Sequence, residues 1–176
     1  MPHTTGTATC EVGMSWQRFH RRQTAIRFLL ERLAKNPEQL PDPRRHDELS
    51  DVFDDREQLL CALQHKWTQQ LTGRLDARLG ECDGRGGDRL EAARRAWQDT
   101  ATANPVLREA LDRHVTAPEG ELRRAVERER RLLALTGGLA EHSEPETEIS
   151  RSGAALLQLL HASERQETES PLPVTV

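Results

Sequence analysis

Residues 54–79, DDREQLLCALQHKWTQQLTGRLDARL, decide the fold of this chain. Apolar side chains recur every three or four positions in this stretch, which is the spacing of one face of an α-helix. That face consists of Leu60, Leu63, Trp67, Leu71 and Leu75. Asp54 and Glu57 are spaced as in a capping box, whose two side chains accept hydrogen bonds from free N–H groups at a helix start. The stretch therefore predicts a long helix with one buried face, and Gly73 inside it predicts a bend or a close contact.

Helical patterns also precede and follow this stretch. Ser15 can cap a helix over residues 16–35, because Ser is a favoured residue at helix starts. The apolar face of that helix is formed by Trp16, Phe19, Ile26, Leu30 and Leu33. Four later helices are expected, and they begin near Asp88, Asn104, Pro118 and Ser143. Proline-rich residues 36–45 and glycine-rich residues 80–87 separate the helices, since both residue types interrupt helical structure.

The composition agrees with an all-helical fold. Tyr is absent, Phe and Trp number three each, and charged residues make up 31% of the chain. Strands prefer β-branched and aromatic side chains, whereas Leu, Ala, Arg, Glu and Gln are good helix formers. We therefore expect an all-α bundle of five or six amphipathic helices, in a single domain over residues 15–167. Residues 1–14 and 168–176 are expected to form disordered arms.

The net charge and the spacing of the cysteines indicate which partners and which cellular compartment to expect. A formal net charge of −4 and a pI near 6.0 provide no general attraction to nucleic acid or to an anionic membrane. Cys10, Cys61 and Cys82 are irregularly spaced, which argues against a disulfide framework and for a reducing compartment. The sequence also lacks a membrane-length apolar run and the apolar core of a signal peptide. We expect a cytoplasmic protein that binds neither nucleic acid nor membrane.

One grouping of side chains has the chemistry of a metal site. Glu57, Cys61 and His65 recur at four-residue intervals, so they share one face of the predicted helix. They are metal candidates only if other elements supply further ligands, and we interpret them as a half-buried boundary face. No histidine has a glutamate three residues before it, as a di-iron carboxylate bundle requires, and no phosphate loop or nucleophile elbow is found. We therefore expect no catalytic residue, no bound metal and no cofactor.

The stretch Phe53–Leu60, together with Trp67 and Leu71, is similar to the segment that follows the recognition helix in TetR-type repressors. In that family a helix–turn–helix lies immediately before the segment. The corresponding place in this chain holds three prolines, Pro37, Pro41 and Pro43. Prolines at this spacing prevent a recognition helix. The resemblance therefore implies a helical regulator that lacks a DNA-reading head.

These features favour a non-enzymatic interaction protein, which means a regulator, adaptor or assembly factor that acts through protein–protein contacts. The helices carry more apolar positions than one buried face requires. The additional positions are Phe28, Leu29, Leu59 and Leu159. They predict an interface with a protein partner or with a second copy in a C₂ homodimer, unless the helices pack on two sides and bury them. One alternative is a bundle that binds a small ligand or cofactor in a pocket between helices, near the tryptophans, and another is an enzyme of unrecognised type.

Overall fold

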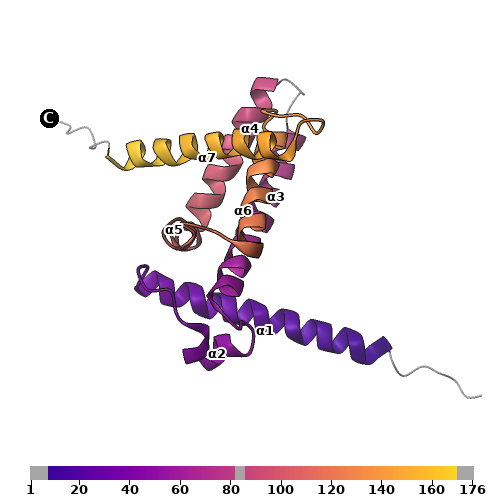
Figure 1. The fold of residues 1–176 in the computed structure, drawn as a ribbon, viewed down its shortest axis with the longest axis vertical. Coiled ribbons are helices and arrows are strands. Elements are labelled where there is room, and N and C mark those ends of the chain that lie inside the picture. Colours follow the sequence, from indigo (N-terminus) through magenta and orange to yellow (C-terminus); the bar gives the residue numbers. More distant parts are fainter. Residues whose placement is uncertain (1–7, 82–85, 170–176) are drawn as a thin grey trace, which may run out of the picture. The chain divides into compact units, whose positions relative to one another are not determined.

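The computed structural model describes residues 8–81 and 86–169, and within them the side chains of residues 16–81 and 88–163. This part of the chain contains seven α-helices, one 3₁₀ turn and no strand (Figure 1). The elements are α1 (Ala8–Lys35), η1 (Pro43–Arg45), α2 (Asp47–Ser50), α3 (Arg56–Gly80), α4 (Gly86–Ala103), α5 (Pro105–His114), α6 (Gly120–Thr136) and α7 (Glu146–Glu169). The all-α class is confirmed, and the helix beyond the expected five or six is the single turn α2.

The chain divides into two compact units. The first comprises Met1–Leu63 and Val106–Thr116, and the second comprises Gln64–Pro105 and Ala117–Val176. Helix α3 therefore begins in the first unit and ends in the second. That residues 15–167 form a single domain stays a prediction.

In the first unit, the second half of α1 is the packed half. Ala25, Ile26, Leu29 and Leu33 are buried there at helical spacing. The other large buried apolar side chains of this unit are Leu49, Phe53, Leu59, Leu60, Leu63, Leu107 and Leu111. Helix α2 packs on α1 and on η1, so the proline-rich segment folds as a short connection rather than as a recognition helix.

In the second unit, the predicted face of α3 is buried as expected at Trp67, Leu71 and Leu75. The Trp67 ring meets the Trp97 ring of α4 edge to face, with the centroids 5.9 Å apart. Helix α6 contacts α4 and packs extensively on α7, which crosses it (Figure 1). At this crossing a Cβ atom on Gly153 would overlap the backbone carbonyl of Arg130, so only glycine allows the two helices to approach this closely.

The ends of two helices show how local signals place the elements. At the start of α3, the Gln58 N–H donates to Asp55 Oδ1 over 2.9 Å, and the Asp54 N–H donates to Gln58 Oε1 over 3.2 Å. The cap is therefore one residue later than the predicted pair of Asp54 and Glu57. At the end of α6, Gly138 has a φ of 71°, and the Leu139 N–H donates to the Ala134 carbonyl over 2.9 Å. This is a Schellman motif, which only a residue tolerant of positive φ completes easily.

Three local expectations need correction. Helix α1 begins at Ala8 rather than near Trp16, because no proline interrupts the residues between them. Helix α7 reaches Glu169, two residues into the segment expected as an arm, and residues 1–7 and 170–176 lie outside the described residues. Gly73 has no atom within 4 Å of the place where a Cβ would stand, so it marks no close contact.

Candidate functional site

The predicted metal candidates lie on α3, but among the described residues the fold adds no ligand to them. Glu57 and His65 are exposed and Cys61 is half-buried. Within the described residues, no group of three or more His, Cys, Asp or Glu side chains is arranged to hold a metal ion. Spacing along one helix placed the three side chains on one face, whereas a metal site also depends on ligands that the tertiary fold must bring in.

The four predicted interface residues have different environments. Leu29 and Leu59 are fully buried, so they contribute to the core and offer no surface to a partner. Phe28 is half-buried, with the Arg32 guanidinium 5.1 Å from its ring centroid. Leu159 on α7 is 67% exposed. The prediction of an interface therefore rests on Leu159 and, in part, on Phe28.

The largest exposed aromatic surface is at the N-terminal half of α1. Trp16 is 63% exposed and Phe19 is 53% exposed, although the sequence analysis placed both on the buried face. Their ring centroids are 6.2 Å apart, and the His20 ring meets the Trp16 ring edge to face at 4.3 Å. Both rings lie on the apolar face that the periodicity predicts, but residues 16–24 are all exposed because α1 is packed only from Ala25 onward. We call Trp16, Phe19 and His20 the aromatic cluster.

Arginines are frequent in the part of α1 that carries the aromatic cluster. Arg18, Arg21, Arg22 and Arg27 are all exposed, and no acidic residue occurs from Val12 to Leu30. The guanidinium of Arg22 lies over the Phe53 ring, 5.5 Å from its centroid. This part of the surface is therefore strongly basic in a chain whose net charge is −4.

A polar group whose members are not among the predicted site residues is buried in the second unit. Glu129 of α6 is 3% exposed and Gln64 of α3 is 2% exposed. Trp67 Nε1 donates to Glu129 Oε1 over 2.6 Å, and Gln64 Nε2 donates to Glu129 Oε2. A signal for this group existed, since Glu129 is spaced from Leu122 and Leu133 as a member of their face. Both carboxylate oxygens accept hydrogen bonds, so the arrangement is that of a structural network linking α3 to α6.

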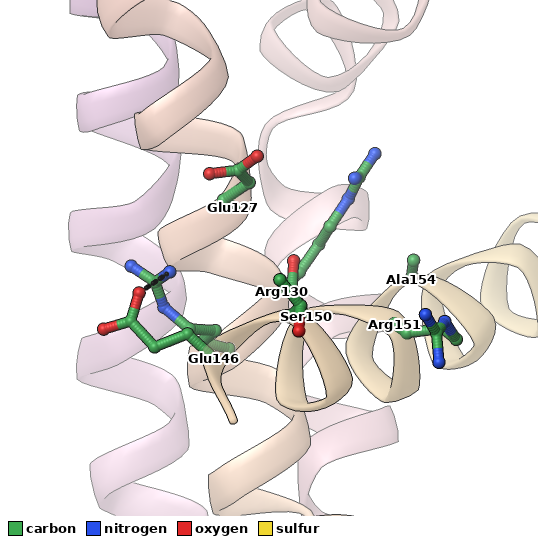
Figure 2. Close-up of a pocket in the computed structure, with 8 residues that line it drawn as sticks. Glu127, Arg130, Glu146, Ser150, Arg151 and Ala154 are labelled. Atoms are coloured by element: carbon green, nitrogen blue, oxygen red, sulfur yellow. Dashed lines mark hydrogen bonds and ion pairs between the residues drawn. The ribbon is translucent and has the colours of Figure 1, made fainter. Parts of the chain in front are cut away.

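A surface pocket of about 390 Å³ lies between α6 and α7 in the second unit (Figure 2). Its lining includes Arg130, Arg131, Glu146, Ser150 and Arg151. Arg131 Nη1 donates to Glu146 over 2.9 Å, while Arg130 Nε is buried and has no hydrogen-bond partner in the described structure. Figure 2 shows Arg130 and Arg151 pointing in different directions, so their positive charges do not converge on one point.

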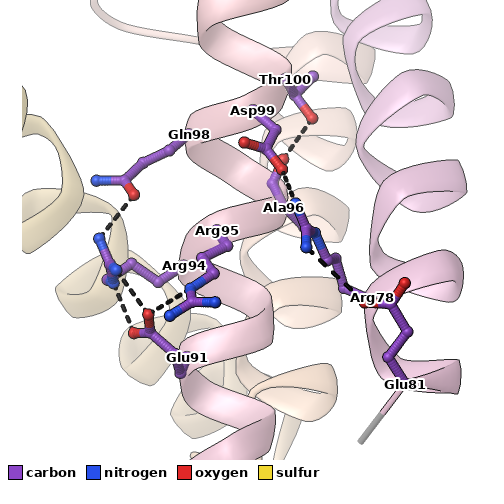
Figure 3. A network of polar contacts seen from close by, with 9 residues as sticks. All are labelled: Arg78, Glu81, Glu91, Arg94, Arg95, Ala96, Gln98, Asp99 and Thr100. Atoms are coloured by element: carbon purple, nitrogen blue, oxygen red, sulfur yellow. Dashed lines mark hydrogen bonds and ion pairs between the residues drawn. The ribbon is translucent and has the colours of Figure 1, made fainter.

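Helix α4 begins two residues before the predicted start near Asp88, and it carries a network of polar side chains (Figure 3). Because α4 begins at Gly86, Glu91 is inside the helix and accepts hydrogen bonds from Arg94 and Arg95 over 2.6–2.7 Å. These bonds, first from Arg94 and then from Arg95, lower the pKa of Glu91 from 4.5 to about 2. Glu91 and Arg94 are half-buried and Arg95 is exposed, and ion pairs of this spacing within one helix are typical of a helix surface.

In the first unit, His114 at the end of α5 is tied to the proline-rich connection. Its Nε2 lies 3.0 Å from the Pro37 carbonyl oxygen. Burial lowers the pKa of His114, the hydrogen bond to Pro37 opposes this, and the charges of Arg56 and Arg113 lower the pKa further. His114 is therefore neutral over a wider pH range than an exposed histidine.

Compared with known protein families, with curated proteins and with solved structures, the chain matches none of them. None of the helices in the described part is long and apolar enough to cross a membrane. The function must therefore be inferred from the surface itself.

Proposed function

We propose that this chain is a non-enzymatic interaction protein that binds another protein through the aromatic cluster of α1. The observation that carries the proposal is the exposure of Trp16 and Phe19 side by side on a helix. Tryptophan, tyrosine and arginine are the residues most enriched among those that dominate binding energy at protein interfaces. Two exposed aromatic rings among arginines therefore have the composition of an interface centre.

The helix also presents these rings in a favourable way. The second half of α1 is buried, so it holds the first half in a helical conformation that a short isolated peptide would adopt only marginally. A binding surface that is already ordered loses less conformational entropy on association. The packed half of α1 thus supports the half that contacts the partner.

Comparative affinity capture from the native cell tests the proposal. The wild-type chain, a Trp16→Ala/Phe19→Ala variant and a Leu159→Ser variant would serve as baits. We expect one protein to be retained by the wild type and by Leu159→Ser and lost with Trp16→Ala/Phe19→Ala. Equal retention by all three baits would mean that the aromatic cluster is not the binding surface.

Two other functions have an observation in their favour. Exposed Leu159 favours a homodimer through α7, and sedimentation equilibrium of the wild type and Leu159→Glu would detect it. The pocket between α6 and α7 favours binding of a small ligand, since about 390 Å³ is within the usual range of ligand sites. Arg131 and Glu146 of its lining are paired with each other, and Arg130 and Arg151 point in different directions, which is why the aromatic cluster is the better-supported site.

A further inference from the structure

The aromatic cluster belongs to a coiled-coil seam. Positions 16, 19, 23, 26, 30 and 33 alternate in steps of three and four residues, which is the a and d spacing of a heptad repeat. Ile26 and Leu33 of this series are buried within the chain, whereas Trp16, Phe19 and Gln23 are exposed. The second half of the seam thus packs into the chain's own core, whereas the first half of the seam is open to solvent.

The residues that flank the open half of the seam are basic. His20 and Arg22 flank the open half at an e and a g position, and Arg27 occupies the next e position, beside buried Ile26. All three are exposed. In coiled coils the charges at e and g select the partner, because they face the corresponding positions of the other helix.

This charge pattern disfavours a second copy of the chain as the occupant. Two copies paired along the seam, in either direction, would bring their basic flanks together, and juxtaposed like charges oppose association. The seam is also narrow, because Gln23 interrupts it after two rings. A helix that lies in a membrane interface needs a wider apolar face than this.

Resting on the proposed function, we propose that the partner contributes an acidic amphipathic helix that continues the coiled-coil packing along Trp16, Phe19 and Gln23. The apolar residues of that helix pack between the two aromatic rings. Its flanking glutamates or aspartates lie opposite His20, Arg22 and Arg27. Complementary flanks of this kind provide both affinity and selectivity.

Binding of synthetic helical peptides to the full chain tests this inference. One peptide carries Leu at a and d and Glu at e and g, and the second is identical except for Lys at e and g. We expect the Glu peptide to bind at least roughly tenfold more tightly, and its advantage to shrink as salt is added. Trp16→Ala/Phe19→Ala should abolish binding.

A charge-reversal variant makes the test specific. His20→Glu/Arg27→Glu should reverse the preference toward the Lys peptide, whereas Arg18→Glu/Arg21→Glu, which alters the outer face of the same helix, should leave the preference for the Glu peptide in place. Equal binding of both peptides, or binding of neither, would overturn the acidic-helix inference. So would binding only to vesicles of three parts phosphatidylcholine to one part phosphatidylserine.

Failure of this inference can be told apart from failure of the proposed function. If cellular capture depends on Trp16 and Phe19 while neither peptide is preferred, the interaction function stands and the acidic helix is wrong. If the Glu peptide binds but capture is unchanged in Trp16→Ala/Phe19→Ala, the seam is chemically competent and the proposed cellular function is wrong.

Discussion

Trp16 and Trp67 lie on apolar faces with the same periodicity, yet they have opposite environments. Trp67 is fully buried in the second unit, beside Trp97 and with its Nε1 bonded to Glu129. Trp16 is 63% exposed and contacts only side chains of its own helix among the ring contacts of the described structure. Periodicity therefore identifies which face of a helix is apolar, but it does not identify what covers that face. An apolar face that the fold leaves exposed is a better indication of function than an apolar face that the fold buries.

Of all the substitutions, those of the two tryptophans should differ most in their effect on the free energy of unfolding. Trp67→Ala removes a large buried side chain and should reduce the free energy of unfolding by about 3–5 kcal/mol. Trp16→Ala should change it by no more than about 0.5 kcal/mol, because the side chain is largely solvated already. Chemical denaturation followed by circular dichroism measures both values. Similar losses in the two variants would mean that Trp16 supports the fold rather than binding.

Substitution of Glu129 in the buried polar group should cause the next largest loss in the free energy of unfolding. Glu129→Ala removes the acceptor of the Gln64 and Trp67 donors, and a buried donor left unpaired costs about 1–3 kcal/mol. Glu129→Gln keeps one acceptor and should cost less. Glu127→Ala, two residues earlier on α6, is the control and should stay within about 0.5 kcal/mol. A loss from Glu127→Ala as large as that from Glu129→Ala would show that the buried bonds contribute little.

Two glycines extend the comparison between packed and open faces. Gly153→Ala would place a Cβ against the Arg130 carbonyl, and such overpacking costs about 1–3 kcal/mol or more. Gly73→Ala, in open space within α3, should instead stabilise the chain by about 0.5–1 kcal/mol. Melting temperatures of the two variants should therefore shift in opposite directions. A shift in the same direction would contradict the close crossing of α6 and α7.

The smallest expected effect is on how the free energy of unfolding changes with pH. Because burial lowers the pKa of His114, the unfolded chain binds this proton at a higher pH than the folded chain does. The stability that neutral His114 contributes is therefore fully present above the unfolded pKa of about 6.5 and is lost as pH falls through the lower folded value. Unfolding free energies from pH 8 down to pH 5 should fall less steeply for His114→Gln than for the wild type. Parallel curves would mean that His114 titrates normally.

Much of the helical framework follows from local sequence signals. The starts of α3, α5 and α6 lie within two residues of the predicted ones at Asp54, Asn104 and Pro118, because capping residues and proline act on the adjacent backbone. The site was harder to predict, since Gln64 and Glu129 come together only through the packing of α3 on α6. The exposure of Trp16 likewise depends on where other elements pack along α1. Neither the contact between Gln64 and Glu129 nor the exposure of Trp16 can be predicted from the residues of one helical turn.

The division into two units has a consequence for any attempt to dissect the molecule. The polypeptide passes between the units at three places, within α3, at the start of α5 and after α5. A chain shortened after Leu63 would retain α1 and α2 but lose α5, whose Leu107 and Leu111 belong to the same unit. No single cleavage therefore releases either unit whole. The aromatic cluster must be studied on the intact polypeptide, where α5 is still present to complete the unit that carries it.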